Sequence, residues 1–421
     1  MSVELTWTGK AEGDHRPEPD PLTTIELAPG ADGSGAPRGR LIHGENGGVL
    51  AELTKTLAGA VDLIVIDPPF ATGTDRLYET TAGRRKLRAR AYADQWSRDL
   101  PGYLDMMRAR LRLCHELLSP RGSLYLHCDP RTSHALRFLG DELFGPRRFI
   151  NELVWFYKTG GLPEKLGFGR KHDTILFYVK DPEQAIWNPQ KEKSYLSHRY
   201  GFSNVQIHED AGGPYTEVNC RDVFDIPALR GNQPERVDYP TQKPEALLER
   251  IIRASSVPDS LVVDVFSGSG TTAVTAAKLG RRFLACDRGA WAIHMARSRL
   301  LALGADDGPA PGFTVEQAGT RDEPAPEPEL ARLRPRLSKD GAELILVGPR
   351  SRSRALDGIH GWLLEAPARP DSEPLLVTAS AFRTRRRAEL APAVPLTAPA
   401  GTARLRLFDT RGASRTLRLE A

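Results

Sequence analysis

The sequence predicts an α/β protein built on a mostly parallel, doubly wound sheet. Apolar runs of strand length alternate along the chain with longer segments in which apolar residues recur at helical spacing. That alternation is typical of β-α-β units, whose crossover helices cover both faces of a parallel sheet. A chain of 421 residues is long enough to bury the core that such a sheet requires, with room for two or three domains.

The first half of the chain contains the clearest strand, VDLIVI at 61–66. It stops at two consecutive prolines, because proline donates no backbone hydrogen bond and restricts the residue before it. Leu104, Met107 and Leu111 then recur at helical spacing. The further elements expected here are a helix at 100–118, a strand at 123–129, a helix at 131–143, and strands at 149–157 and 173–179.

The second half repeats the alternation around a Gly-rich turn. A strand at 261–265 (LVVDV) leads into this turn, a helix follows to about residue 279, and a second strand (RFLACD) is expected at 282–287. Helices are expected at 244–255 and 290–303.

Composition divides the chain into four segments. Residues 1–40 are rich in Pro, Gly and Asp and are expected to form a mobile or draped N-terminal arm, and 41–303 form the α/β domain. Residues 304–335 include EPAPEPE and are typical of a Pro/Ala/acidic linker. Short alternating stretches in 336–421 predict a small β-rich accessory domain.

Charge and cysteine usage exclude several classes of protein. The formal net charge is only +4, which permits a nucleic-acid partner without requiring one. No run of 18 apolar residues exists, and the N-terminus lacks the apolar segment of a signal peptide, so we expect a cytoplasmic protein. The four cysteines form no CxxC pair and the histidines show no metal-ligand spacing, so neither a disulfide framework nor a metal site is expected.

The Gly-rich turn is the first motif with chemical content. It runs from Phe266 to Thr272 between a strand and a helix, where glycines allow a ligand to approach the backbone and the helix N-terminus. No Lys-Ser/Thr pair follows, so it is not a P-loop. Asp287 ends the next strand and could accept the two hydroxyls of a ribose. This pattern suits NAD and S-adenosylmethionine equally well.

The second motif is Asp67-Pro68-Pro69-Phe70, at the carboxyl end of a buried strand. Asp67 and the carbonyl of Pro68 could accept both hydrogens of an exocyclic amine while Phe70 stacks on the ring that carries it. Holding both hydrogens makes the nitrogen lone pair available for reaction. The alternative is that the prolines only end the strand and Asp67 caps a turn.

Together these motifs resemble those of S-adenosylmethionine-dependent DNA amino-methyltransferases of the permuted class, in which the catalytic motif precedes the cofactor motif. The modification subunits of type III restriction systems and related adenine-specific enzymes are the nearest likeness, over about residues 40–303. The resemblance implies a Rossmann-like class I methyltransferase sheet. It also implies S-adenosylmethionine as cofactor and double-stranded DNA as substrate, with adenine N6 methylated by base flipping and direct displacement.

The resemblance also assigns roles to individual residues. Asp67, Pro68, Pro69 and Phe70 match the family's catalytic motif. Glu45, where Asp is usual, and Asn46 match a turn that contacts the cofactor adenine. The remaining implied cofactor residues are Asp67, Thr241, Gln242, Lys243, Asp264, Phe266, Ser267, Gly268, Ser269, Gly270, Thr271, Thr272 and Asp287.

Three alternatives to this reading remain open. N4-cytosine methylation is chemically close, although Asp67 favours adenine because N4-cytosine enzymes more often carry Ser in its place. A catalytically silent, DNA-binding subunit is the second, and the intact motifs argue against it. An NAD-dependent dehydrogenase is the third, and it leaves the Asp-Pro-Pro-Phe motif unexplained. Cytosine-C5 methylation is excluded because no cysteine follows a proline.

Two segments are candidates for DNA contact. Residues 71–98 are expected to form a loop, and 76–90 hold six basic residues against one acid, which predicts phosphate binding or, alternatively, a solvated charge run. The polar and aromatic insertion at 181–238 is the candidate target-recognition region. A separate restriction subunit and a homodimer are further partners that the resemblance allows. The individual DNA-binding candidates are Arg84, Arg85, Lys86, Arg88 and Lys158.

Overall fold

The structure is a computed structural model. It describes residues 4–10, 15–28, 30, 37–71, 73–82, 85–92, 94, 99–158, 166–196, 205–231, 233–237, 239–306, 311–319, 334–337, 343–347, 359–367, 375–382, 393–395, 403–409 and 412–418. None of the helices in these ranges combines the length and apolar character needed to cross a membrane.

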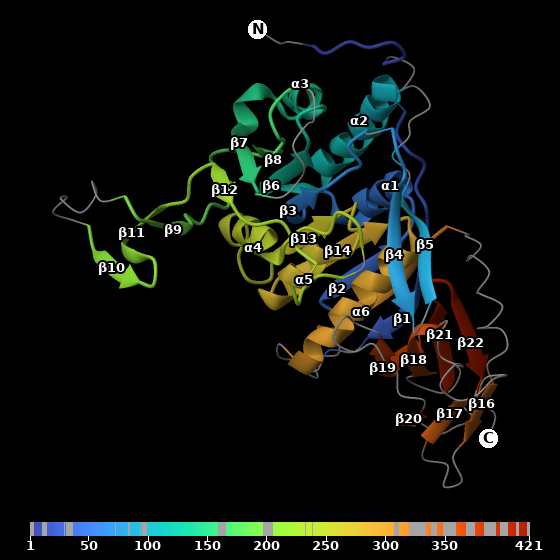
Figure 1. Ribbon diagram of the computed structural model, residues 1–421. Helices are drawn as coiled ribbons and strands as arrows, with labels where there is room; N and C mark the ends of the chain where they lie inside the picture. The colour runs from blue at the N-terminus through green and yellow to red at the C-terminus, as the bar shows by residue number, and fades with distance from the viewer. Residues whose placement is uncertain are drawn as a thin grey trace.

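Six neighbouring parallel strands form the centre of the molecule, which confirms the predicted doubly wound α/β class (Figure 1). They lie in the order β6-β3-β13-β14-β2-β15 within a sheet of 14 strands. Their bounds are β2 (Gly39–His43), β3 (Val61–Ile66), β6 (Leu118–Cys128), β13 (Leu261–Asp264), β14 (Arg282–Asp287) and β15 (Phe313–Ala318).

Helices cover both faces of this sheet. One face carries α1 (Asn46–Leu57), α2 (Asp99–Leu117) and α3 (Ser133–Phe144), and the other carries α4 (Glu245–Ala254), α5 (Thr271–Lys278) and α6 (Ala290–Asp306). Each helix presents an apolar stripe to the sheet. In α4 the residues Leu247, Leu248, Ile251 and Ile252 are buried, which is the helical spacing expected of a packed face.

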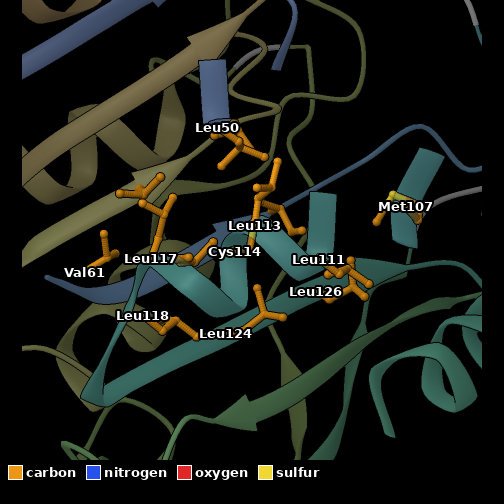
Figure 2. Close-up of a cluster of buried hydrophobic side chains, with 14 of the residues drawn as sticks. Leu50, Val61, Met107, Leu111, Leu113, Cys114, Leu117, Leu118, Leu124 and Leu126 are labelled. Carbon is orange, nitrogen blue, oxygen red and sulfur yellow. The ribbon is translucent and has the colours of Figure 1, made fainter. Parts of the chain in front are cut away.

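The interior of the first face is continuous from helix to strand. Figure 2 shows Leu50 of α1, Leu111 and Leu117 of α2, and Leu124 and Leu126 of β6 gathered in one cluster, and all are essentially inaccessible to solvent. Close packing of this kind fixes where the strands end, and therefore where the loops that follow them begin.

Antiparallel strands extend the sheet beyond β6. The strand β8 (His172–Val179) pairs antiparallel with both β6 and β7 (Phe149–Phe156), and β12 (Val223–Asp225) pairs with β7. Thr174 lies opposite Cys128 and Asp173 opposite Trp155. The start of β8 is thereby placed beside the carboxyl end of β6.

Two strands lie where the composition predicted an arm and a linker. Within 1–40, β1 (Leu22–Ala28) pairs antiparallel with β15, and β15 itself lies within the expected linker at 304–335 and pairs with β2. Both strands are short and lie in Pro- and Ala-rich sequence, so the composition did not predict them. In β1, Glu26 is fully buried and lies 3.4 Å from Arg297 Nε and 3.5 Å from Arg406 Nη1.

The segment expected as a loop at 71–98 contains a β-hairpin instead. Its strands are β4 (Arg76–Ala82) and β5 (Arg85–Tyr92), which form a separate two-stranded ribbon (Figure 1). The loop prediction was therefore wrong for these residues. Arg alternates with Ala at 88–91 of β5, and its partner β4 contains Tyr78, Thr80 and Thr81, which are residue types that favour strands.

C-terminal strands are present as predicted, but part of them continues the main sheet. The strands β18 (Ile359–Pro367), β19 (Leu375–Phe382), β21 (Arg404–Asp409) and β22 (Ser414–Arg418) follow β1, through its parallel pairing with β19. A second small sheet holds β16 (Arg334–Leu337), β17 (Glu343–Val347) and β20 (Ala393–Pro395). The division into domains stays a prediction.

The insertion at 181–238 contains its own sheet. It consists of β9 (Lys191–Ser194), β10 (Ile207–Asp210) and β11 (Gly213–Asn219), and it projects away from the body of the molecule (Figure 1). Trp187, Tyr195 and Ile207 are each about half exposed there.

Candidate active site

The carboxyl ends of the parallel strands meet at one edge of the sheet, where a cavity of about 200 Å³ opens. Crevices at this edge are where open α/β sheets bind ligands. Most of the predicted site residues line this single cavity, although they come from segments up to about 240 positions apart. They are Glu45, Asn46, Asp67, Pro68, Pro69, Phe70, Thr241, Gln242, Lys243, Asp264, Phe266, Ser267, Gly268, Ser269, Thr271, Thr272 and Asp287.

Asp67 directly follows β3 and carries a strongly perturbed carboxyl. Its Oδ2 forms a very short ion pair with Lys243 Nζ, and its Oδ1 lies 2.8 Å from His127 Nδ1. Burial raises the pKa of Asp67, but the charges of Lys243 and His127 outweigh burial and hold the pKa well below its usual value. Asp67 is therefore a carboxylate, able to accept hydrogen bonds but poorly suited to take up a proton.

Phe70 closes the same corner of the cavity. Its ring meets the His127 ring edge-on at 5.2 Å between centroids, and Lys243 Nζ lies 5.6 Å from the Phe70 centroid. The two prolines between Asp67 and Phe70 fix the backbone of this turn. The motif thus places a carboxylate and an aromatic face side by side.

The Gly-rich turn follows β13, the strand next to β3. Asp264 at the end of β13 accepts hydrogen bonds from the Phe266 N–H (3.0 Å) and the Thr272 hydroxyl (2.6 Å), which shapes the turn. Burial raises the pKa of Asp264 to about 7, although both hydrogen bonds oppose the rise. Gly270 lies behind the turn rather than in the cavity wall.

A side chain at Gly270 is prevented by packing as well as by backbone conformation. Its φ is +77°, and a Cβ there would lie 2.5 Å from the Cβ and 2.9 Å from the Cα of Ala296 in α6. The glycine therefore allows α5 to start close against α6. Helix packing therefore requires glycine at position 270. Gly268, in contrast, lies in the cavity wall.

Asp287 ends β14, the next strand. Its carboxylate accepts hydrogen bonds from the backbone N–H groups of Gly268 (2.9 Å) and Gly289 (2.8 Å). Burial raises its pKa, and these two hydrogen bonds oppose the rise. The backbone N–H of Arg288 also donates to this carboxylate, and because a carboxylate has about four acceptor positions, it retains capacity for a further donor.

Glu45 and Asn46 stand at the start of α1. Glu45 caps the helix by accepting from Gly47 N–H (2.7 Å) and forms an ion pair of 2.5 Å with Arg110 Nη2. Burial raises the pKa of Glu45, but Arg110 brings it below its usual value. Asn46 donates to the Val265 carbonyl (2.8 Å), which ties this helix to the strand that carries the Gly-rich turn.

The Thr241-Gln242-Lys243 segment precedes α4. Gln242 holds the chain before it, accepting from Val237 N–H (2.8 Å) and donating to the Glu235 carbonyl (2.7 Å). Lys243 reaches across to Asp67 and also donates to the Thr241 carbonyl at 3.3 Å. Lys243 thereby connects this segment to the Asp-Pro-Pro-Phe motif.

The sequence prediction missed several residues of the site. His127 is the next-to-last residue of β6, and Asp173 lies near the start of β8, 3.2 Å from His127 Nε2. Tyr239 and Arg110 also line the cavity. A polar residue at the carboxyl end of a strand beside β3 was the available signal for His127. Asp173 required the antiparallel pairing of β8 with β6 to be known.

The structure locates the DNA-binding candidates only in part. Arg84 lies outside the described residues. Arg85, Lys86 and Arg88 lie along β5, of which the structure describes the backbone, and Lys158 is exposed just after β7. Lys158 does not line the cavity.

The fold and the cavity together define a class of protein. A doubly wound sheet carries a Gly-rich turn with an acid on the following strand, and the adjacent strand brings a carboxylate and an aromatic face into the same cavity. This is typical of an α/β enzyme whose one cavity takes a nucleotide-type cofactor together with a second substrate.

Comparison with known proteins identifies the family. The family model described as DNA methylase matches residues 61–298, more than half of the chain. The DNA adenine methyltransferase YhdJ of Escherichia coli K12 is 31% identical over 271 residues, which cover 62% of this chain and 82% of YhdJ. The type II methyltransferase M.HpaI of Haemophilus parainfluenzae is 28% identical, over 57% of this chain and 68% of that protein. The chain belongs to the DNA methylase family.

Solved structures also align with the chain. The crystal structure of the M1.HpyAVI–SAM complex aligns over 62% of this chain and 98% of that one, with 19% identity and a TM-score of 0.42.

Proposed function

We propose that this protein transfers the methyl group of S-adenosylmethionine to the N6 amine of adenine in double-stranded DNA. One observation carries the proposal. The Asp67 carboxylate and the Phe70 ring lie in the same cavity as the Gly-rich turn and Asp287, on strands β3, β13 and β14 that neighbour one another. The Asp in the motif and the likeness to an adenine methyltransferase favour adenine over cytosine.

The residues of the cofactor turn suit S-adenosylmethionine. Ser267 Oγ is buried in the cavity wall and has no hydrogen-bond partner within the described part of the chain, and Asp287 has acceptor capacity left for a ribose hydroxyl. When bound, S-adenosylmethionine supplies an electrophilic methyl group on a sulfonium. Leu247, Leu248 and Ile251 add an apolar wall to the same cavity.

The catalytic motif would act on the target amine. Asp67 Oδ2 and the Pro68 carbonyl accept its two hydrogens, and Phe70 stacks on the base. The amine nitrogen of a nucleobase is a weak nucleophile until its hydrogens are held in this way. As the N–CH₃ bond forms, the S–CH₃ bond breaks and its electron pair stays on sulfur. The amine then loses one proton, which passes to water because Asp67 is too weak a base to retain it.

Adenine inside a duplex cannot reach this cavity, so the base must be flipped out, at a cost of a few kcal/mol. We assign phosphate contact to the basic residues of the β4–β5 hairpin and to Lys158, and target recognition to the projecting sheet of β9, β10 and β11. The assignment of the hairpin rests on charge and position, and those of Lys158 and the projecting sheet rest on exposure and position.

The family description leaves N4-cytosine methylation as the second candidate. The discriminating experiment incubates the purified full chain with unmethylated plasmid DNA and labelled S-adenosylmethionine, digests the DNA to nucleosides and identifies the methylated one by mass spectrometry. The proposal expects N6-methyladenine from wild type and none from Asp67→Ala. N4-methylcytosine in its place would establish the second candidate. Single-molecule sequencing of the same DNA gives the target motif.

A further inference from the structure

His127 is a buried charged group inside the site, and the methyl-transfer steps give it no part. Its side chain is 6% exposed and lies between two carboxylates, with Nδ1 2.8 Å from Asp67 Oδ1 and Nε2 3.2 Å from Asp173 Oδ2. The rings of Phe70 and Trp155 enclose it at centroid distances of 5.2 and 5.8 Å. This packing fixes the plane of the imidazole.

Charged groups on three other elements decide the protonation of His127. Burial lowers its pKa and the charge of Lys243 lowers it further, but Asp67 after β3 and Asp173 on β8 raise it, and the net result lies above the usual value. The neighbours from β7 and the residue after it are the uncharged Trp155 and, farther out, the Tyr157 hydroxyl. The two carboxylates therefore favour the charged imidazolium, which forms an ion pair with each of them.

Asp173 is itself held in place. The Tyr157 hydroxyl donates to its Oδ1 at 3.2 Å, while its Oδ2 faces His127. Burial raises the pKa of Asp173, but His127 lowers it below its usual value, so it stays a carboxylate. A carboxylate that holds one imidazole nitrogen fixes the orientation of the other.

The two oxygens of Asp67 thus have different partners. Oδ1 faces an imidazole that strands and rings hold rigidly, whereas Oδ2 is paired with Lys243, whose long aliphatic chain has several rotatable bonds. A target amine needs one of these oxygens, and only the lysine can withdraw without disturbing the sheet.

We propose that His127 is a positioning residue for methyl transfer: oriented by Asp173, it holds Asp67 Oδ1 throughout and so presents Oδ2 to the target amine as Lys243 withdraws. This inference rests on the proposed methyltransferase function. It adds the charged side chain of His127 to the residues that position the target amine. It also adds Asp173, which lies on β8, a strand without a recognised motif.

A required imidazolium predicts a specific pH dependence. The rate should fall as pH rises through the pKa of His127, because neutral imidazole holds Asp67 less firmly. Asp173→Asn removes one of the two negative charges that raise this pKa, so the alkaline limb should move to lower pH. A residue that only fills space would not move it.

The experiment measures kcat and KM of the full-length protein on unmethylated plasmid DNA from pH 6 to 9, for wild type, His127→Gln and Asp173→Asn. Glutamine can still donate one hydrogen bond to Asp67, but it cannot carry charge. We expect kcat of His127→Gln to fall about 10- to 100-fold with the alkaline limb lost, while its affinity for S-adenosylmethionine stays within about twofold. His134→Gln, an exposed change on α3, is the matched control.

Three outcomes are informative. A lowered kcat together with the shifted limb in Asp173→Asn supports the proposal. A His127→Gln variant with wild-type kcat and an unchanged pH profile overturns it and leaves the proposed function standing. Wild type that binds S-adenosylmethionine but methylates no DNA overturns both. If His127→Gln does not fold, Asp173→Asn alone decides, because an unmoved alkaline limb contradicts the proposal.

Discussion

The backbone N–H of Gly268 donates a 2.9 Å hydrogen bond to Oδ2 of Asp287, which joins the Gly-rich turn after β13 to the acid that ends β14. The two strands are adjacent and parallel, and the Ser267 N–H also donates to the Cys286 carbonyl at 3.0 Å, so the turn is held against the end of β14 at two points. The carboxylate thus shapes the turn and would also receive the ribose.

The first prediction concerns this double role. Asp287→Asn removes the negative charge at the ribose position but keeps one oxygen that can accept from Gly268. We expect the affinity for S-adenosylmethionine to fall about 10- to 100-fold, as for the loss of charge-assisted hydrogen bonds. The free energy of unfolding should also fall by about 1–3 kcal/mol, because the Gly289 N–H then faces the amide NH2. Titration calorimetry measures the affinity. Asp222→Asn, an exposed acid before β12, should leave it unchanged.

The second prediction separates steric from conformational effects of glycine. Gly270→Ala places a Cβ 2.5 Å from the Cβ of Ala296 and forces a positive φ on alanine, whereas at Gly280 (φ +71°) nothing lies within 4 Å of the new Cβ. We expect Gly280→Ala to lower the free energy of unfolding by about 1 kcal/mol and Gly270→Ala by about 2–4 kcal/mol. Urea unfolding measures both. Equal losses would contradict the packing argument.

The parallel core and the two motifs could be predicted from the sequence because local signals carry them. VDLIVI and LVVDV are mostly apolar because their strands are buried on both faces, and a Pro-Pro pair or a Gly-rich turn follows each within a few residues. The edges of the sheet lacked such signals. In β1, Glu26 is fully buried against Arg297 and Arg406, a pairing that only the folded chain creates.

The sequence predicted only those site residues that have a local signal. Residues beside Pro and Gly could be predicted because they lie in recognisable turns. His127 and Asp173 sit in strands whose neighbours come from elsewhere in the chain, and their proximity depends on the register of β8 against β6. Glu45 was expected at the cofactor, and in the structure it also caps α1 and pairs with Arg110, a contact between helices that motif spacing cannot reveal.

The third prediction follows from the raised pKa of Asp264. In the unfolded chain this carboxyl has its ordinary pKa near 4, whereas burial raises the folded value to about 7. Between these values the folded state binds more protons than the unfolded state, so the contribution of Asp264 to stability is present below pH 4 and is lost as pH rises to 7. Above pH 7 no further change is expected.

Asp264→Asn tests this linkage, because the amide can still bond Phe266 N–H and the Thr272 hydroxyl but does not titrate. The free energy of unfolding of wild type minus that of the variant should decrease from pH 4 to 7 and then stay constant. Urea unfolding at pH 4.5, 5.5, 6.5 and 7.5 measures this difference. A constant difference across that range would show that Asp264 stays ionised in the folded protein.

The last prediction concerns DNA contact by the β4–β5 hairpin. If Arg84, Arg85 and Lys86 bind phosphates, replacing all three with alanine should reduce the slope of log K against log salt concentration by up to about 0.9 for each phosphate that is no longer neutralised. Fluorescence anisotropy with a labelled duplex at several salt concentrations measures the slope.

The control removes three basic residues that already pair with carboxylates: Arg16 with Glu116, Arg38 with Asp259, and Lys55 with Glu52. An unchanged slope in the hairpin variant would mean that these charges only solvate the ribbon, and equal reductions in both variants would point to net charge rather than to a DNA-binding surface.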